Sequence, residues 1–387
     1  MPGTPGKTCK RILALILAAM TLIAVSACGK KPSSEVVIDI DSPSKTQPAA
    51  APTTAPTEAG ETPAPETPAP TDEPSPGTPP AIISRSGSYV TYEGTNVMRV
   101  DDRAYEMCVY LEDVAKQYAE IIEAVAEALS GRARVFDMII PMSYGIMMPD
   151  DVRPKISYYI DMKECIAKTY SYMPKVNTVS VFDTLMMHRN EFIYFRTDHH
   201  WTARGAYYAY VQLMYKLGKT PNRLSDYREV SFDGFLGTMY KDSGNDQALL
   251  PAEVVYAYYP VSEGVKMTIH ASNGKVFEYP IVCDVTNYNA SAKYDVFAGE
   301  DNPLTVFTNP AVTDGSSCIV IKESFGNAMM AFICDHYSTV YEIDYRYYKG
   351  SIVEFAKEHN VNDVIFLNNF MMISSKSNVG KLAMIAK

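Results

Sequence analysis

The sequence predicts an α/β protein built around a mostly parallel sheet, because short apolar strands alternate with helical segments in two separate runs. The C-terminal run is the clearer one, with strands at 317–321, 339–343 and 364–367 and helices at 326–336 and 352–359. An earlier run has strands at 135–140 and 178–182, with a helix at 156–172 between them. Alternation of this kind is typical of βαβ units, in which helices cover a parallel sheet.

The N-terminus has the pattern of a secretory signal. Basic residues precede an apolar run at 12–25 that is too short for a comfortable membrane span and ends in small residues. The next cysteine, Cys28, resembles the cysteine of a bacterial lipobox, which becomes the lipidated first residue of the mature chain. We therefore predict a lipoprotein signal peptide at 1–27 and an extracytoplasmic chain anchored to the bacterial cell membrane through Cys28. The alternative is an ordinary signal peptide in which this cysteine has no role.

A linker follows the signal. Residues 28–80 are rich in Pro, Thr, Ala and Glu, and they cannot bury enough apolar surface to fold. We predict a disordered spacer there and a folded domain at 81–387. Within the domain, apolar residues recur at helical spacing over 103–130 and predict a long helix. Short alternating strands broken by Gly, Asn and Pro predict a β-rich insertion at about 227–310.

Composition excludes several classes of partner. The net charge of −10 argues against nucleic acid, since phosphate binding needs a basic surface. No two cysteines have the C-x-x-C spacing, and no zinc-like set of ligands is present in the sequence. We therefore predict no disulfide framework, no metal and no cofactor.

The stretch 196–202, Arg-Thr-Asp-His-His-Trp-Thr, is the strongest candidate for a functional site. It follows a short apolar strand at 192–195 and precedes a helix at 203–217, for which Thr202 is the expected N-cap. Polar turns between a strand and a helix are where α/β proteins hold reactive groups.

Residues two apart in an extended turn point to the same side, so Asp198 and His200 are expected to share a face. This makes His200 a candidate general base and Asp198 the acid that orients it. His199 is expected to point away and to support the site or contact substrate. Trp201 is expected either to wall the site, where it could stack on a sugar, or to lie in the core.

A second polar junction lies at 321–327, between a strand and a helix. Ser324 there is a candidate nucleophile, because helix N-terminal N–H groups stabilise an acyl-transfer oxyanion. The alternative is that Ser324 only caps the helix. Gly326, through its N–H, and Asn327, through its amide, are candidate oxyanion donors. Arg346 closes the next strand and is expected either to hold an anionic group of the substrate or to pair with Asp344.

The stretch 196–202 resembles the signature of the DHHW family of bacterial secreted proteins. Its Asp-x-His-Trp is also similar to the SGNH-hydrolase-like domains of alginate O-acetylation proteins, in which Asp-x-His precedes a later Gly-Asp-Ser. The resemblance implies a flavodoxin-like three-layer fold, circularly permuted relative to ordinary SGNH esterases. It places the acid, base and nucleophile on Asp198, His200 and Ser324. One departure is Lys322, which stands where these relatives have the glycine that lets the backbone approach the substrate.

The leading hypothesis is a surface-anchored serine esterase or O-acyltransferase that acts on cell-envelope or exopolysaccharide glycans. A membrane protein is a possible acyl donor. The second hypothesis is a catalytically degenerate glycan-binding or assembly lipoprotein, for which Lys322 is the main indication. A third compares Asp-His-His with the manganese motif of DHH phosphoesterases. The only earlier Asp-x-Asp, at 39–41, lies in the spacer, which argues against it.

Overall fold

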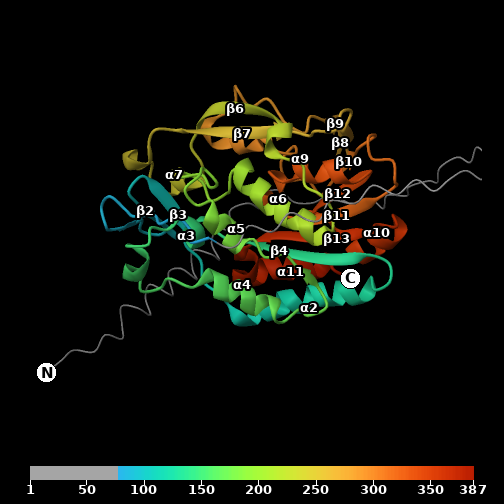
Figure 1. Cartoon of the computed structure of the whole chain (residues 1–387), viewed down its shortest axis with the longest axis horizontal. Helices are drawn as coiled ribbons and strands as arrows, with labels where there is room; N and C mark the ends of the chain where they lie inside the picture. Colours follow the sequence, from blue (N-terminus) through green and yellow to red (C-terminus); the bar gives the residue numbers. More distant parts are fainter. Residues whose placement is uncertain (1–76) are drawn as a thin grey trace, which may run out of the picture. The chain divides into compact units, whose positions relative to one another are not determined.

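The computed structural model describes residues 77–387, so the predicted signal peptide, Cys28 and nearly all of the predicted linker lie outside the described residues. The described chain has a mixed α/β fold around an eight-stranded sheet, and the strands of this sheet that are labelled in Figure 1 appear there in sheet order from bottom to top. In sheet order, its strands are β5 (Asn177–Thr178), β4 (Arg134–Ile140), β13 (Asp363–Asn369), β11 (Ser317–Lys322), β12 (Thr339–Asp344), β10 (Leu304–Thr308), β8 (Lys266–His270) and β9 (Val276–Tyr279).

The prediction of a parallel sheet is confirmed for the strands from β5 to β12, which all run in one direction. At their centre, β11 is buried along its whole length, as expected of a strand covered on both faces. β10, β8 and β9 then extend the sheet with antiparallel pairing. The whole sheet is therefore mixed.

The remaining strands form two smaller sheets. The predicted β-rich segment at 227–310 supplies β8–β10 and also a two-stranded sheet of β6 (Arg228–Phe235) and β7 (Glu253–Tyr259). Near the start of the described chain, β1 (Val90–Thr91), β2 (Val97–Val100) and β3 (Arg103–Glu106) form a three-stranded sheet. That 227–310 is an insertion, and that the fold is circularly permuted, stay predictions.

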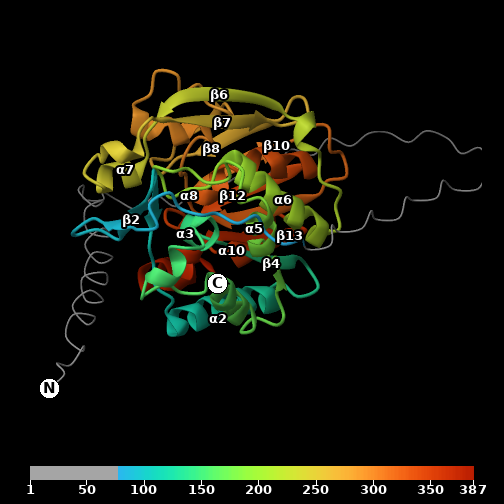
Figure 2. The same cartoon turned by 60° about the vertical axis from the view of Figure 1, so that its left-hand side comes forward.

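The helices are α2 (Glu112–Ala128), α3 (Ser143–Met147), α4 (Met162–Tyr170), α5 (Phe182–Met187), α6 (Ala203–Leu217), α7 (Thr238–Asp242), α8 (Ser324–Asn327), α9 (Met330–Ile333), α10 (Ile352–Glu358) and α11 (Lys376–Ile385). α2 packs against β4 and α11, while α6 packs against α9 and β7. In Figures 1 and 2, α2 lies at the end of the sheet marked by β4, and the β6–β7 pair lies at the opposite end. Within 77–387, none of the helices has the length and apolar character needed to cross a membrane.

Several predicted elements have different bounds. The long helix predicted at 103–130 begins only at Glu112, because 103–106 pairs with β2 as strand β3. The helix predicted at 156–172 is confined to α4. The strand predicted at 178–182 ends at Thr178, since the chain turns into α5 from Phe182.

Two other predictions near the site were wrong. Residues 192–195 form no strand, because Phe195 donates its N–H back across the turn to the His200 carbonyl and only Tyr194 makes an isolated bridge, to Trp201. The helix predicted at 326–336 is broken into α8, α9 and a 3₁₀ turn, η5 (Cys334–His336). Around the site the chain is therefore made of short turns.

The ends of the strands position the candidate site. Lys322, the last residue of β11, lies opposite Asp344 on β12 and Leu367 on β13. Ser324 follows beyond this carboxyl edge as the first residue of α8. Carboxyl edges of parallel strands are where open α/β sheets bind ligands.

Candidate functional site

Three residues predicted to act together lie in one hydrogen-bonded line. The Nδ1 atom of His200 lies 2.6 Å from Asp198 Oδ1, and its Nε2 atom lies 2.8 Å from Ser324 Oγ. An ionised Asp198 can only accept hydrogen bonds, so we assign the ring proton of His200 to Nδ1. Nε2 is then free to accept from the serine hydroxyl. Asp198 and His200 are buried, whereas Ser324 is partly exposed. This is the geometry in which a histidine removes a proton from a serine.

The Asp198 carboxylate is held on both oxygens. Oδ1 also accepts from the backbone N–H of His200 at 3.0 Å, and Oδ2 accepts from the N–H of Thr238 at 2.9 Å and from its hydroxyl at 3.1 Å. Burial opposes ionisation, but the charges of His199 and His200 and these hydrogen bonds lower the pKa of Asp198 well below its ordinary range. Asp198 is therefore an ionised, fixed acceptor for the histidine.

Gly237 makes room for this contact. A Cβ atom at Gly237 would lie 2.2 Å from the Asp198 Cβ and 2.3 Å from its Oδ2. The adjacent turn residue Thr197 donates its N–H and hydroxyl to the buried carboxylate of Glu253, on β7, at 2.8 and 2.5 Å. The turn at 196–200 is thus held to the first residue of β7.

The His200 ring lies between aromatic side chains. Tyr294, on the 3₁₀ helix η4 (Ala290–Val296), stacks on it with 3.9 Å between ring centroids and 14° between planes. The Tyr294 hydroxyl also donates to the Ser324 carbonyl at 3.1 Å. Burial, together with the neighbouring His199, lowers the pKa of His200 to about 4 despite the attraction of Asp198. His200 is therefore neutral, and able to accept a proton, at pH 7.

His199 does not point away from His200, as the extended-turn argument predicted. Residues 196–200 form a bend, and the two imidazole rings lie 4.0 Å apart. His199 Nδ1 lies 2.8 Å from the Thr238 hydroxyl, which itself donates to Asp198. Burial opposes protonation of His199, but Asp198 and other acids raise its pKa.

The two candidate oxyanion donors are engaged elsewhere. The Gly326 N–H donates to the Glu323 carbonyl at 2.9 Å, and the Asn327 amide donates to Asp301 Oδ1 at 3.2 Å. Gly326 has another reason to be glycine, because its Cβ would lie 2.6 Å from the Cβ of Lys322. In this arrangement the Gly326 N–H and one of the two N–H donors of the Asn327 amide are already committed.

Glu323 fixes the start of α8. Its Oε2 accepts from the N–H of Phe325 at 3.1 Å, and its Oε1 accepts from the N–H of Asn369 at 2.9 Å. The serine hydroxyl lies 3.4 Å from Oε2, a longer contact than the one to His200. Burial raises the pKa of Glu323. Glu323, the residue before the serine, thus connects the start of α8 to the end of β13.

Two further predicted residues have structural partners. Trp201 is fully buried and donates its indole N–H to the Phe325 carbonyl at 2.9 Å, so it is a core residue and does not stack on substrate. Arg346 pairs with Asp344 through Nη2 at 2.6 Å and with Asp301 at 2.8 Å. Of the two expectations for Arg346, pairing with Asp344 is the one observed.

The structure brings in residues that the sequence did not single out. Thr238, Glu253, Tyr294 and Asp301 all lie in the segment predicted to be a β-rich insertion. Of these residues, only Thr238 follows a conspicuous local pattern, the Gly-Phe-Leu-Gly stretch at 234–237, and that pattern is typical of a flexible turn and does not indicate close packing against an acid.

Asp198, His199 and His200 also place potential metal ligands within 4.8 Å of one another. Both oxygens of Asp198 already accept two hydrogen bonds each, so a metal ion would have to displace these donors. The arrangement favours a hydrogen-bonding role for the acid.

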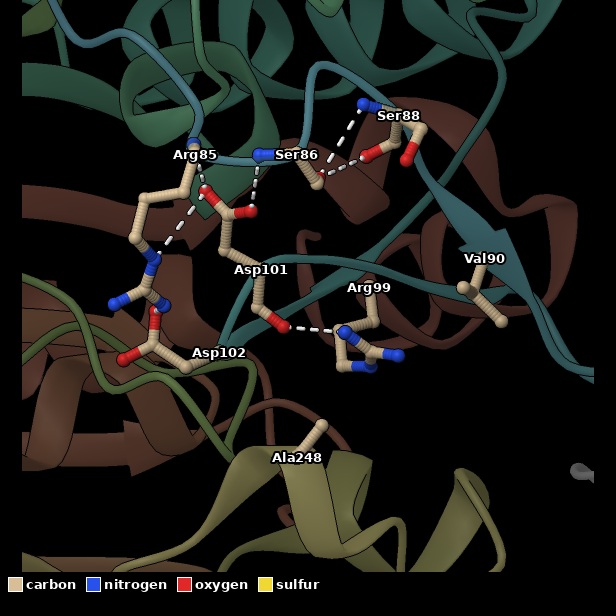
Figure 3. Close-up of a pocket in the computed structure, with 8 residues that line it drawn as sticks. All are labelled: Arg85, Ser86, Ser88, Val90, Arg99, Asp101, Asp102 and Ala248. Atoms are coloured by element: carbon tan, nitrogen blue, oxygen red, sulfur yellow. Dashed lines mark hydrogen bonds and ion pairs between the residues drawn. The ribbon is translucent and has the colours of Figure 1, made fainter.

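A polar hollow of about 360 Å³ lies among β1–β3 and the residues before them, and none of its lining residues surrounds Ser324. Figure 3 shows Arg85 beside Asp101 and Asp102 in this hollow, and its guanidinium lies 2.8 Å from Asp102. Arg99 donates to the backbone carbonyl of Asp101. Arg85 is paired with Asp102 and Arg99 with Asp246, and Ser324 is not part of the lining, so the hollow adds nothing to the candidate site.

Residues 71–343 match the DHHW protein family. The crystal structure of a DHHW family protein from Eubacterium siraeum has a TM-score of 0.68 at 25% identity, covering 76% of this chain and 97% of that chain. PatB1 of Bacillus cereus, in a structure with a sulfonyl adduct, has a TM-score of 0.61 at 16% identity, covering 75% and 98%. The likeness to PatB1 shows a shared fold.

The O-acetyltransferase domain of Pseudomonas putida AlgJ matches at a TM-score of 0.36 and 11% identity, covering 79% of this chain and 99% of that chain, and is too distant to support an argument. Among curated proteins no match is found. The family match covers well over half of the 387 residues and includes the stretch 196–202, which confirms the resemblance. The chain belongs to the DHHW family.

Proposed function

We propose that this protein is a serine esterase or O-acyltransferase that acts on glycans of the cell envelope. The observation that carries the proposal is the line of hydrogen bonds from Asp198 through His200 to Ser324, with the proton-accepting nitrogen 2.8 Å from the serine oxygen. A neutral imidazole in contact with a partly exposed serine is suited to nucleophilic attack on an ester.

The proposed reaction has two steps. Ser324 Oγ attacks the acyl carbon while His200 Nε2 takes the hydroxyl proton, and His200 then gives that proton to the departing alcohol oxygen. In the second step, water or a sugar hydroxyl loses its proton to His200 and attacks the acyl-enzyme. The products are a free acid or a new ester, and Ser324 regains its proton.

The Gly326 N–H is engaged, and the Asn327 amide is held against Lys322 and Asp301, so we look for a further oxyanion donor. Asn369 is the last residue of β13. It lies next to the serine segment, since its N–H donates to Glu323, the residue before Ser324. Its side-chain oxygen accepts from the Met371 N–H, and its Nδ2 donates to no protein group within residues 77–387. We assign Asn369 Nδ2 as a donor to the developing oxyanion.

The glycan acceptor and the acetyl group are inferred from the resemblance of 196–202 to alginate O-acetylation proteins. The membrane anchor at Cys28 and an acyl-donor membrane protein are likewise parts of the proposal, supported by the signal-like pattern at 1–28. An SGNH-like, circularly permuted fold is consistent with the order of Asp198 and His200 before Ser324.

The test is labelling of the folded protein with a sulfonyl fluoride, followed by mapping of the adduct. PatB1 was solved with a sulfonyl adduct, which makes this reagent class suitable. We expect modification at Ser324, absence of labelling in His200→Ala, and turnover of acetyl esters by the unlabelled enzyme. Absence of labelling in a protein shown to be folded would overturn the proposal.

The pKa of His200 predicts the acid limb of the activity. Protonated His200 cannot accept the serine proton, so the labelling rate should hold from pH 7 to about 5 and fall as the pH drops through about 4. His199→Gln removes a positive neighbour that lowers this pKa, so the acid limb should move to higher pH. Labelling rates between pH 3.5 and 8 measure the acid limb of the parent protein and of His199→Gln, and circular dichroism confirms that both are folded. An unmoved limb in His199→Gln would show that His199 does not tune the base.

A non-catalytic glycan-binding function is the second candidate. The observation that favours it is that both predicted oxyanion donors, Gly326 and Asn327, are bonded to other groups. This function predicts glycan binding that persists in Ser324→Ala, without ester turnover by the parent protein.

A further inference from the structure

Lys322 replaces the glycine expected before the serine, and its surroundings are unusual for a lysine. Its side chain is fully buried, with Nζ 2.5 Å from Asn327 Oδ1, 3.3 Å from Asp301 Oδ1 and 3.2 Å from Glu342 Oε1. Burial opposes its charge, but Glu342, Asp344 and Asp301 raise its pKa. Burying the charge of a lysine costs free energy because the charge loses its hydration. The acidic partners offset this cost, so the lysine and its partners form one structural unit.

The neighbouring backbone is adapted to this lysine. A Cβ at Gly326 would lie within 3.2 Å of three successive carbons of the Lys322 side chain. The lysine stem thus packs directly against Gly326 in α8, two residues after Ser324. Its charged end lies opposite Asp344 across the β11–β12 pair, at 3.6 Å.

Asp301 connects this lysine to another part of the site. Its Oδ1 also accepts from Asn327, and its Oδ2 pairs with Arg346 at 2.8 Å. Asp301 ends the segment 294–301, which we call the strap. At the other end of the strap, Tyr294 stacks on His200 and bonds the Ser324 carbonyl.

The strap has a backbone that needs fastening. Ala298, Gly299 and Glu300 all have positive φ, at 49°, 66° and 70°, and two of them carry a Cβ. Successive left-handed residues are costly and persist only where the surroundings hold them. The middle of the strap is paired with residues 281–283 through the Cys283 N–H to Val296 and the Ala298 N–H to Ile281, and the ion pairs of Asp301 add a second hold directly after the left-handed residues.

We propose that Lys322 is a positioning residue, which fastens the strap through Asp301 and so holds Tyr294 against His200 and the Ser324 carbonyl. This inference rests on the proposed function, and it reverses the meaning of the departure at Lys322. The lysine is part of the machinery that orients the base, rather than a mark of lost chemistry.

Three variants test the proposal. Lys322→Met keeps the apolar stem and removes the charge, and Asp301→Ala releases the strap at a side chain that is only partly buried, so it is the variant expected to fold more readily. Both should slow sulfonyl labelling of Ser324 by about 10- to 100-fold, as expected when a reacting group is displaced. Lys322→Gly should also slow labelling, whereas a lysine that had merely damaged the site would predict faster labelling in this variant.

Asp150→Ala is the matched control. Asp150 is a partly exposed acid that, like Asp301, lies between two cations, 2.9 Å from Arg189 and 3.6 Å from Arg153. It has no hydrogen bond to the strap or to the candidate triad among the described residues. Its loss should lower the melting temperature without slowing labelling.

The pKa of His200 gives a readout that a general loss of stability does not move. The charged groups that act on His200 are Asp198, His199 and Asp301. Removing the negative charge of Asp301 by itself lowers the pKa of His200, whereas a loosened strap exposes the ring and raises it. We expect a rise in Asp301→Ala and in Lys322→Met, measured by NMR titration in a Ser324→Ala background and assigned with a His200→Gln sample.

The two proposals fail in different ways. Parent protein that does not label at Ser324 contradicts the proposed function, while the NMR titration still reports on the strap. Parent protein that labels, with unchanged labelling in folded Asp301→Ala and Lys322→Met, contradicts the role of Lys322 alone. A lowered pKa of His200 in Asp301→Ala also contradicts it.

Discussion

Ser324→Ala is expected to abolish acyl-ester turnover, with a loss of about 10⁴- to 10⁶-fold. The reason is that Ser324 Oγ is the nucleophile bonded to His200 Nε2 at 2.8 Å, and alanine leaves no oxygen there. His200→Ala should cost a similar factor, because the serine then has no base. The double variant should lose little more than either single one, since a nucleophile and its base act as a unit.

Initial rates on a chromogenic acetyl ester measure this effect. Ser143→Ala is a matched control, because Ser143 also begins a short helix after a strand, and its buried Oγ has no partner among the described residues. It should retain turnover. Turnover that survives in Ser324→Ala, or losses that simply multiply in the double variant, would rule out the proposed unit.

Asp198→Asn is expected to lower turnover by about 10³- to 10⁴-fold without disturbing the fold. Thr238 donates two hydrogen bonds to Oδ2 of Asp198, whereas the only fixed donor to Oδ1 is the His200 N–H, so the oxygen of an asparagine should face Thr238 at the cost of that one bond. Its NH₂ group then faces His200 Nδ1 and forces that nitrogen to accept. The proton moves to Nε2, which points at Ser324, and the imidazole no longer works as a base.

The tautomer of His200 can be followed directly by ¹⁵N NMR, alongside kcat at pH 7 to 8. Asp242→Asn serves as the control, because this acid affects the pKa of His199 but makes no hydrogen bond to His200. Normal turnover in Asp198→Asn, or an unchanged tautomer, would show that Asp198 does not orient the base.

Local patterns in the sequence predicted much of the framework. The central strand β11 contains the apolar run 318–321. The helix α6 begins after Thr202, whose hydroxyl accepts from the Gly205 N–H, and it ends at Gly218, which has a φ of 75°. Such signals involve residues a few positions apart, so they survive in a single sequence. The predicted bounds of helices and strands were wrong where the backbone hydrogen-bonds within another strand pair or turn, as at 103–106 and 192–195.

The candidate residues could also be picked out from the sequence. An acid and two imidazoles in one turn, and a serine after a buried strand, are chemically conspicuous wherever they fold. That the turn and the serine lie together in space could only be inferred, since 124 positions separate His200 from Ser324. What the sequence could not settle was which way a side chain or N–H faces: His199 lies beside His200 instead of pointing away, Trp201 takes the core position of its two alternatives, and the Gly326 N–H and Asn327 amide bond to Glu323 and Asp301.

By itself, then, the sequence determined the α/β class and the chemical groups of the candidate site, because these follow from composition and short-range spacing, and the resemblance of 196–202 indicated the family. Only the tertiary structure decided that Thr238 would clamp Asp198, that Tyr294 would stack on His200, and that Lys322 would be buried among acids. These contacts join segments that are far apart in the chain, and their geometry depends on how the sheet, the strap and the turn pack together. No local pattern carries that information.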